Sequence, residues 1–191
     1  PTDEDLAALV AELAAAQAES VAIAFLNSYA NPQNEDLVAE YIRRNLAGVP
    51  VTTSSSLSRQ WREYERFTTA TANAYISPVA HRYLHRLVSG VSEGGFRGEF
   101  VVLDSSGGAM TLETAINKPV QAVESGPVGG VIAARALAAR LGIEDLCTFD
   151  MGGTTAKSAL VENGEYARRD LYWIGGERKG FPLQVSTVDI I

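Results

Sequence analysis

Apolar and polar positions in the first 50 residues alternate between helical and extended patterns. Apolar side chains recur at helical spacing near the start, at Leu6, Leu9, Val10 and Leu13. Thr2, with Asp5 three positions later, is typical of a capping box that opens this helix. The nearly continuous apolar run over residues 20–29, SVAIAFLNSY, predicts a strand covered on both faces, as in a parallel sheet. Asn31 and Pro32 then indicate the start of a second helix.

A long helical pattern follows a short strand-like stretch, PVTTSSS. It runs from about residue 62 to about residue 88, with Pro78 inside it. Proline removes a backbone donor, so we expect a kink or break there, with Ser77 capping the second half. The stretch 89–98, SGVSEGGFRG, is rich in glycine and polar residues. It is the best boundary between two domains, which we place at residues 1–95 and 96–191.

The second half alternates short extended runs with helical ones. We predict strands at 99–104 and 119–125, a short helix at 111–117, and a helix over about 127–141 that Gly142 ends. A further strand carries Asp150, and Asn163-Gly164 indicates a type I′ hairpin after it. The order of elements predicts an α/β fold, a mostly parallel sheet with crossover helices and an antiparallel hairpin.

Charge and composition exclude several classes of function. The 191 residues carry a formal net charge of −7, and the basic residues are scattered, which argues against a nucleic-acid partner. No apolar run is long enough for a membrane span, and no signal peptide is visible. The single cysteine, Cys147, fits a reducing cytoplasm and is expected to be a small buried hydrophobe. The chain starts at Pro1 without methionine and ends in an apolar run, so we expect a fragment of a longer polypeptide.

The sequence TFDMGGTTAK brings candidate chemistry to the end of the Asp150 strand. Gly152 and Gly153 leave backbone N–H groups free to face a phosphate, and Thr154 and Thr155 add hydroxyl donors. Asp150 would repel phosphate unless a divalent cation, or a water bound to one, lay between them. The alternative is a tight hairpin whose aspartate caps backbone amides. The turn lacks the lysine and the following helix of a P-loop.

Two other glycine-containing stretches are candidates for a site. ESGPVGG opens a helix, where Ser125, Gly126, Gly129 and Gly130 would present amides to an anion. The alternative there is close packing of the helix on a strand. DSSGG follows a strand, and its candidate substrate-binding residues are Ser105, Ser106, Gly107 and Gly108. A plain turn is the alternative.

Three remaining features have structural interpretations. REYER, at residues 62–66, is either a charged helix start or the lining of a substrate site. His81 and His85 share a helix face, but no third zinc ligand is evident, which favours ordinary helix-surface histidines. Trp61 and Trp173 are expected to serve packing.

FDMGGTTAKSALVENG resembles the second phosphate loop of the sugar kinase, actin and heat-shock ATPase superfamily. Four further stretches, in order, extend the resemblance over nearly the whole chain: SVAIAFLNSYANPQNE, REYERFTTATANAYISPV, VVLDSSGGAM and AVESGPVGG. Together they resemble the hydantoinase A/5-oxoprolinase family, which includes acetone and acetophenone carboxylase subunits. The resemblance implies a ribonuclease H-like, actin-like ATPase fold. It also implies an ATP- and Mg²⁺-dependent subunit that phosphorylates an amide, lactam or hydantoin carbonyl, with a hydantoinase B-type subunit or domain completing the reaction.

By this resemblance Asp150 would hold Mg²⁺, directly or through water, while Gly152, Gly153, Thr154 and Thr155 would bind phosphates. Many members continue with Thr-Asp, where this chain has Ala156-Lys157, so Lys157 either meets a phosphate or faces solvent. DSSGG likewise replaces the QSNGG common elsewhere. The superfamily uses two phosphate loops and only one is present here, so we expect this chain alone to bind ATP weakly or not at all.

Three functions are consistent with these residues. The first is hydrolysis of a cyclic amide after ATP-dependent activation. The second is ATP-dependent carboxylation of a ketone on the same fold, which the Thr-Thr-Ala-Lys variant favours slightly. The third is a non-catalytic module that keeps the fold without the reaction.

Overall fold

The computed structural model describes residues 1–177 and 179–191, which form two compact units. Unit 1 comprises Pro1–Gly98, Ile116–Val120 and Trp173–Gln184. Unit 2 comprises Glu99–Ala115, Gln121–Tyr172 and Val185–Ile191.

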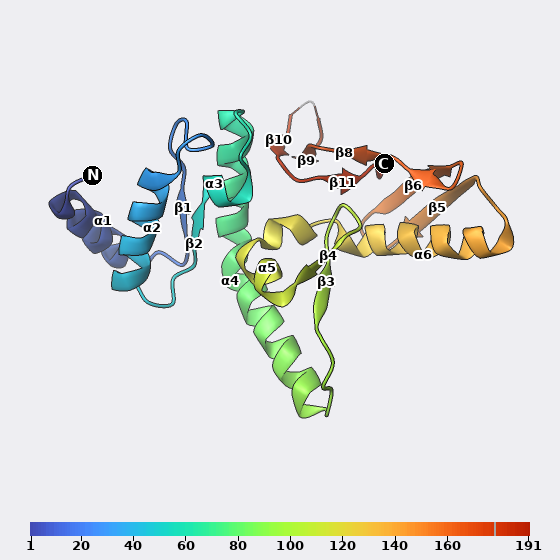
Figure 1. Ribbon diagram of the computed structural model, residues 1–191, viewed down its shortest axis with the longest axis horizontal. Helices are drawn as coiled ribbons and strands as arrows, with labels where there is room; N and C mark the ends of the chain where they lie inside the picture. The colour runs from blue at the N-terminus through green and yellow to red at the C-terminus, as the bar shows by residue number, and fades with distance from the viewer. Residues whose placement is uncertain (178) are drawn as a thin grey trace. The chain divides into compact units, whose positions relative to one another are not determined.

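Unit 1 is built around one parallel strand pair and a long helix (Figure 1). Its elements are α1 (Asp3–Ala15), β1 (Val21–Ile23), α2 (Gln33–Asn45), β2 (Val51–Thr53), α3 (Ser54–Leu57), α4 (Glu63–Glu93) and β10 (Phe181–Leu183). The strands β1 and β2 pair in parallel with Val21 opposite Val51, and α2 is the crossover between them. Buried side chains of α1, β1 and α2 form the core: Leu6, Ile23, Val38, Ala39 and Ile42.

Local signals explain where the first elements begin and end. The capping box is confirmed, because Thr2 Oγ1 accepts the Asp5 N–H at 3.2 Å and Asp5 Oδ2 accepts the Thr2 N–H at 2.8 Å. The strand predicted over 20–29 is only three residues long. The chain turns directly after it, and Asn27 takes a positive φ of 59°. Asparagine tolerates this left-handed conformation, which ends an extended run despite its apolar sequence.

Of the kink or break predicted at Pro78, the break is absent, whereas the helix axis bends along its length (Figure 1). The helix α4 is continuous over 31 residues. Ser77 does not cap a second helix, since its hydroxyl donates to the Asn73 carbonyl one turn earlier at 2.7 Å. Asn73, Ser77 and Leu84 are buried on either side of the proline, so tertiary packing holds the helix together across the missing N–H.

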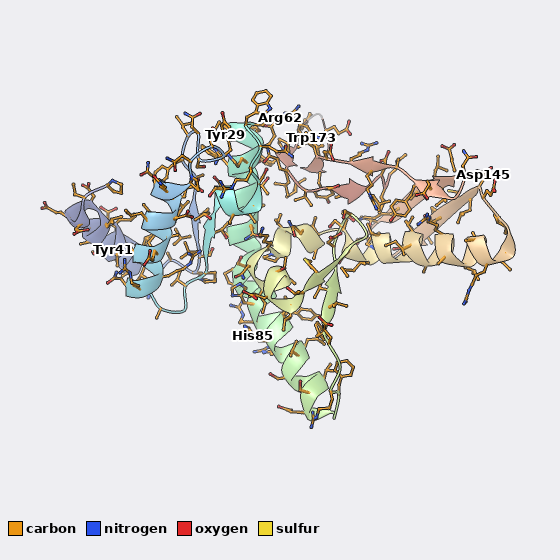
Figure 2. All side chains as sticks on the ribbon, in the orientation of Figure 1. Tyr29, Tyr41, Arg62, His85, Asp145 and Trp173 are labelled. Atoms are coloured by element: carbon orange, nitrogen blue, oxygen red, sulfur yellow. The ribbon has the colours of Figure 1, made fainter. Side chains whose placement is uncertain are left out.

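A fully buried ion pair lies inside unit 1. Glu35 of α2 and Arg66 of α4 each have no exposed surface, and Arg66 Nη1 lies 3.6 Å from Glu35 Oε1. The hydroxyls of Ser28 and Ser54 donate to the same carboxylate at 2.7 and 2.5 Å. Within REYER, therefore, Arg66 belongs to the interior, while Arg62 is exposed at the start of the helix (Figure 2).

Unit 2 contains small antiparallel sheets, so the prediction of a mostly parallel sheet is wrong. Its elements are β3 (Val101–Leu103), β4 (Ala109–Thr111), α6 (Ser125–Leu141), β5 (Leu146–Met151), β6 (Ala156–Glu162), β7 (Glu165–Tyr166), β8 (Arg168–Arg169) and β11 (Thr187–Val188). The antiparallel pairs are β3–β4, β5–β6, β6–β7 and β8–β11. Short turns connect most of them, and a short turn can only join antiparallel neighbours.

The connecting segments complete the chain. They are α5 (Leu112–Asn117), a 3₁₀ helix at Pro119–Ala122, and β9 (Tyr172–Ile174), which pairs with β10. We predicted a strand at 119–125, but that stretch makes a helical turn. The N–H of Val120 bonds to the Asn73 side chain at 3.1 Å rather than to another strand, so the apolar spacing misled the prediction.

The helix α6 and the hairpin β6–β7 confirm the turn chemistry read from the sequence. Gly142 ends α6 in the left-handed conformation, with φ 71°. Asn163 and Gly164 both have positive φ, as a type I′ turn requires. The helix α6 packs along β5 and β6 (Figure 1), and their shared core includes Val128, Val131, Ala159, Val161 and Val188. None of the helices in the described residues combines the length and the apolar character needed to cross a membrane.

Candidate functional site

The hairpin β5–β6 carries Asp150 to the mouth of the glycine turn. Asp150 lies opposite Lys157, and Met151 lies opposite Ala156 where the strands end. The turn is closed by a hydrogen bond from the Gly152 N–H to the Thr155 carbonyl at 3.0 Å. All residues from Asp150 to Thr155 are exposed. The sequence prediction of a strand delivering a carboxylate to an exposed turn is confirmed in its local geometry.

Neither glycine of this turn is needed for packing. A Cβ placed on Gly152 or Gly153 would meet no atom within 4 Å, and neither residue has a left-handed φ. In the part of the chain that the structure describes, the N–H groups of Gly153 and Thr154 have no hydrogen-bond partner. The turn thus leaves two backbone donors free and its glycines unobstructed, which would let a phosphate group approach. The alternative of a plain hairpin turn is also consistent with this geometry.

The start of α6 has a similar character. Ser125 is its first residue, and Gly126, Gly129 and Gly130 lie in its first two turns. A Cβ on Gly129 would come within 3.3 Å of the Leu103 side chain, so helix–strand packing accounts for that glycine. Gly126 and Gly130 would meet nothing within 4 Å. Glycine inside a helix costs about 0.5–1 kcal/mol relative to alanine, and packing does not account for these two.

One side chain that the sequence reasoning did not select joins these segments. Glu124, directly before α6, accepts the Tyr172 hydroxyl at 2.7 Å through Oε1 and pairs with Lys157 Nζ through Oε2. Its own N–H donates to Ser105 Oγ at 3.0 Å. We call Ser105, Glu124, Lys157 and Tyr172 the Glu124 cluster. Glu124 was the first letter of the quoted ESGPVGG stretch, but a lone glutamate before a helix gives no spacing signal.

The charges of this cluster are closely coupled. Burial raises the pKa of Tyr172 to about 12, and the hydrogen bond to Glu124 and the negative charge of Glu124 act in the same direction. The Lys157 ammonium pairs with the buried Glu124 carboxylate rather than simply facing solvent. Its contact with a phosphate stays a prediction. Asp150 stands directly across the ladder from Lys157. The positive charge beside the turn is therefore held in place by Glu124.

The DSSGG stretch forms the hairpin between β3 and β4. Asp104 Oδ1 accepts the N–H groups of Ser106 and Gly108 at 2.8 and 2.9 Å. Burial raises the pKa of Asp104, but hydrogen bonds from Ser106, Gly108 and Gly107 outweigh it, and the net pKa is lowered. Gly107 needs its glycine for conformation, with φ 93°.

Ser105 is buried, and both its backbone and its hydroxyl are engaged. Its N–H donates to the Gln121 carbonyl at 2.7 Å, and its carbonyl accepts the Val188 N–H at 2.9 Å. These bonds give the DSSGG stretch a structural role, because they connect its turn to two other segments of unit 2. The substrate-binding role of Ser105, Ser106, Gly107 and Gly108 stays a prediction.

The remaining candidates are the two histidines and the cysteine. His81 Nε2 bonds to the Ile116 carbonyl at 2.8 Å, while His85 is exposed on α4 (Figure 2). Among the described residues no group of three or more His, Cys, Asp or Glu side chains is placed to hold a metal ion. Cys147 is exposed, so the expectation of a buried thiol is wrong. Its place on β5 puts it on the sheet face that also exposes Phe149 and Leu160.

Family models match both parts of the chain. The hydantoinase/oxoprolinase model matches residues 66–191, and the hydantoinase/oxoprolinase N-terminal region model matches residues 1–46. The chain belongs to the hydantoinase/oxoprolinase family. The match includes the glycine turn, the start of α6 and every member of the Glu124 cluster.

Two relatives illustrate the range of this family. The chain is 32% identical to the acetone carboxylase beta subunit of Xanthobacter autotrophicus, over 86% of the chain and 23% of that protein. It is 34% identical to caprolactamase subunit alpha of Pseudomonas jessenii, over 78% of the chain and 21% of that protein. The chain thus spans about a quarter or less of the length of these relatives.

Solved structures agree with the sequence matches. The whole chain superposes on 27% of a nucleotide-free acetone carboxylase chain with a TM-score of 0.84 and 26% identity. It also superposes on 27% of a chain of the ATP-dependent caprolactamase from Pseudomonas jessenii, with a TM-score of 0.81 and 28% identity. The α/β arrangement of short sheets is therefore the arrangement of this part of the family fold.

Proposed function

We propose that the chain is part of an ATP-dependent enzyme subunit that activates the carbonyl oxygen of an amide, lactam or hydantoin by phosphorylation, so that the ring can be hydrolysed. The observation that supports this is the exposed glycine turn beside Asp150, where the N–H groups of Gly153 and Thr154 have no partner within the described residues and neither glycine is needed for packing. The similarity to the ATP-dependent caprolactamase points the same way.

The residues present fit one half of a nucleotide site. The free N–H groups of Gly153 and Thr154 would hold phosphate oxygens, and the hydroxyls of Thr154 and Thr155 would assist. The Gly152 N–H closes the turn on the Thr155 carbonyl, so Gly152 would contribute room for the phosphate instead. Ser125, Gly126 and Gly130 would face the same ligand from the start of α6, where the helix dipole favours an anion. Bound ATP would supply the phosphoryl group.

A magnesium ion would fit here only if Asp150 shared its coordination with nucleotide phosphates and water. Asp150 offers one carboxylate, and no other acidic side chain joins it in a metal-binding group among the described residues. Magnesium commonly keeps several waters and is bound by one or two carboxylates together with substrate phosphates. Asp150 would therefore orient the ion or one of its waters, and Lys157, fixed by Glu124, would offset negative charge near the turn.

An alternative function is ATP-dependent carboxylation of a ketone. The observation that favours it is Lys157, which provides a cation where many family members carry a second acid, together with the similarity to the acetone carboxylase beta subunit. In either reaction we propose that a hydantoinase B-type subunit completes the chemistry and that the enzyme works in the cytoplasm. Assays of the complete enzyme for bicarbonate-dependent turnover and for lactam hydrolysis separate the two reactions.

The direct test replaces Asp150 with asparagine in the full-length enzyme. Asp150→Asn keeps the size and removes the charge, so ATP turnover should fall on the order of 10²-fold or more. Asp145→Asn is the matched control, because Asp145 lies at the opposite end of β5 (Figure 2) and keeps an oxygen for its bond with the Asn163 N–H. Equal ATP turnover in the two folded variants would remove the assigned role of Asp150.

A further inference from the structure

Unit 1 contains a pocket that the proposed reaction does not use. It has a volume of about 230 Å³ and is lined by residues from the end of α2, from β2 and its approach, from α4 and from the end of α5. Its polar lining residues are Arg43, Thr52, Ser77, His81 and Asn117. All of them belong to unit 1, whereas the glycine turn belongs to unit 2.

The carbonyl groups around this pocket are already engaged. Val51 O accepts Arg43 Nη2 at 3.1 Å, and Ile116 O bonds to His81 Nε2 at 2.8 Å. Asn117 O accepts an Asn73 N–H at 3.1 Å. The pocket is lined by no aspartate or glutamate. The acceptors that remain in the lining, such as the Asn117 side-chain oxygen, are neutral, so the pocket has no carboxylate among its described residues to bind a cation.

Donor capacity, by contrast, remains. The Arg43 guanidinium carries five N–H groups, of which the bond to Val51 uses one. Thr52 Oγ1 accepts the Asn73 amide at 2.9 Å, so its own proton points elsewhere, and the residue is buried. No acidic side chain pairs with Arg43 among the described ion pairs, whereas its neighbour Arg44 pairs with Glu40 at 3.7 Å. Arg43 itself is exposed to solvent.

We propose that this pocket binds a compact oxyanion, a carboxylate or a phosphate group, held by the Arg43 guanidinium fork and the Thr52 hydroxyl. Arginine binds such groups in a bidentate manner, and a small acid fits the available volume. Two donors on separate elements, the end of α2 and strand β2, would fix the orientation of the anion. Its residues belong to unit 1 and those of the proposed nucleotide site to unit 2, and the proposal does not depend on the proposed function.

The test uses the full-length protein and two probes, inorganic phosphate and acetate, each titrated by calorimetry. Arg43→Gln should weaken binding of at least one probe tenfold or more, because it removes a charge-assisted hydrogen bond. Arg44→Gln is the matched control, one residue along the same helix but engaged in a surface pair with Glu40, and it should bind as the parent does. Phosphate bound at the glycine turn is unaffected by either change, so the difference between the two variants reports on the pocket alone.

Two further variants make the result decisive. Thr52→Ser keeps the hydroxyl and should retain binding, whereas Thr52→Val should weaken it. Circular dichroism confirms that each variant is folded, and Arg43→Lys replaces Arg43→Gln if the latter is not. If only phosphate binding weakens, the pocket is a site for a phosphate group. If only acetate binding weakens, it is a site for a carboxylate. Equal binding of both probes by the Arg43 and Arg44 variants would overturn the proposal.

Discussion

Polar groups in the interior of unit 1 are buried and mostly hydrogen-bonded, whereas the glycine turn of unit 2 exposes backbone donors without partners in the described part of the chain. In unit 1 the Glu35 carboxylate accepts the Phe25 and Ser55 N–H groups at 2.9 and 2.8 Å, in addition to two serine hydroxyls and the Arg66 guanidinium. In the turn, the N–H groups of Gly153 and Thr154 lack protein partners within the described chain. Folding has satisfied the Glu35 carboxylate in the buried region, although Arg66 Nε has no hydrogen-bond partner among the described residues, whereas the turn has left backbone donors exposed.

This difference distinguishes polar groups that stabilise the fold from polar groups that are available to bind a ligand. A buried charge without partners costs several kcal/mol, so a network such as Glu35–Arg66 must be completed by the fold itself. Donors that face water cost nothing to leave open and can therefore await a ligand. The Glu124 cluster stands between these extremes, because Glu124 is buried yet holds Lys157 next to the open turn.

The largest effect should follow from breaking the buried pair. Arg66→Met leaves the Glu35 charge without its cation and should lower the free energy of unfolding by about 3–5 kcal/mol, as for other buried pairs that lose one partner. Chemical denaturation of the purified protein measures this change. The matched control is Arg62→Met, since Arg62 is exposed at the start of the same helix and should change stability by less than about 1 kcal/mol.

A double variant sharpens the result. Arg66→Met with Glu35→Gln removes both charges, so it should be less destabilised than the sum of the two single changes. Strict additivity of the two free energies would show that the pair does not interact, and the contrast between the two regions would then lose its basis.

A smaller effect is expected where the network is only partly buried. Glu124→Gln removes the charge beside Tyr172, so the tyrosine pKa should fall from about 12 toward its ordinary value of 10.0. The sign for stability follows from the raised pKa. Neutral Tyr172 is favoured by the folded state, so its contribution is complete below the ordinary pKa and is lost as pH rises from about 10 through about 12.

Ultraviolet absorbance of tyrosinate during an alkaline titration measures this pKa, and Tyr172→Phe identifies its contribution. Glu165→Gln is the control. Glu165 is exposed, and its ion pair is with Arg135, at 2.5 Å, and not with Tyr172. A Tyr172 pKa that is the same in the Glu124 and Glu165 variants would exclude a contribution of Glu124 and leave burial as the cause of the shift.

The local elements that sequence patterns predicted well have signals contained within a few residues. The Thr2–Asp5 capping box, the Gly142 helix end and the Asn163-Gly164 turn each depend on the conformation of single residues, and each is confirmed. The glycine turn belongs to this group, because its strand, its glycines and its hairpin partner are contiguous.

The predictions that were wrong depended on partners far away in the sequence. The run after Pro119 looks like a strand, but Asn73, from the middle of α4, takes its Val120 N–H. Pro78 predicted a kink or a break, and the break is absent because buried side chains on both sides hold α4 continuous. A parallel sheet was inferred from the alternation of helices and strands, which does not encode which strands pair. Glu124 was missed for the same reason, since Lys157 and Tyr172 lie 33 and 48 positions away.

The smallest change in stability should come from the turn itself. Gly152→Ala adds a methyl group that meets no atom, at a φ that alanine accepts, so the free energy of unfolding should stay within about 0.5 kcal/mol of the parent. ATP turnover by the full-length enzyme should nevertheless fall, because that methyl group occupies the space of the proposed phosphate. Gly107→Ala is the comparison, since its φ of 93° and the Tyr166 hydroxyl 2.8 Å from the added carbon should cost about 1 kcal/mol or more. If Gly152→Ala left ATP turnover intact, the open space at the turn would not be a phosphate site. The two regions would then differ only in their exposure to solvent.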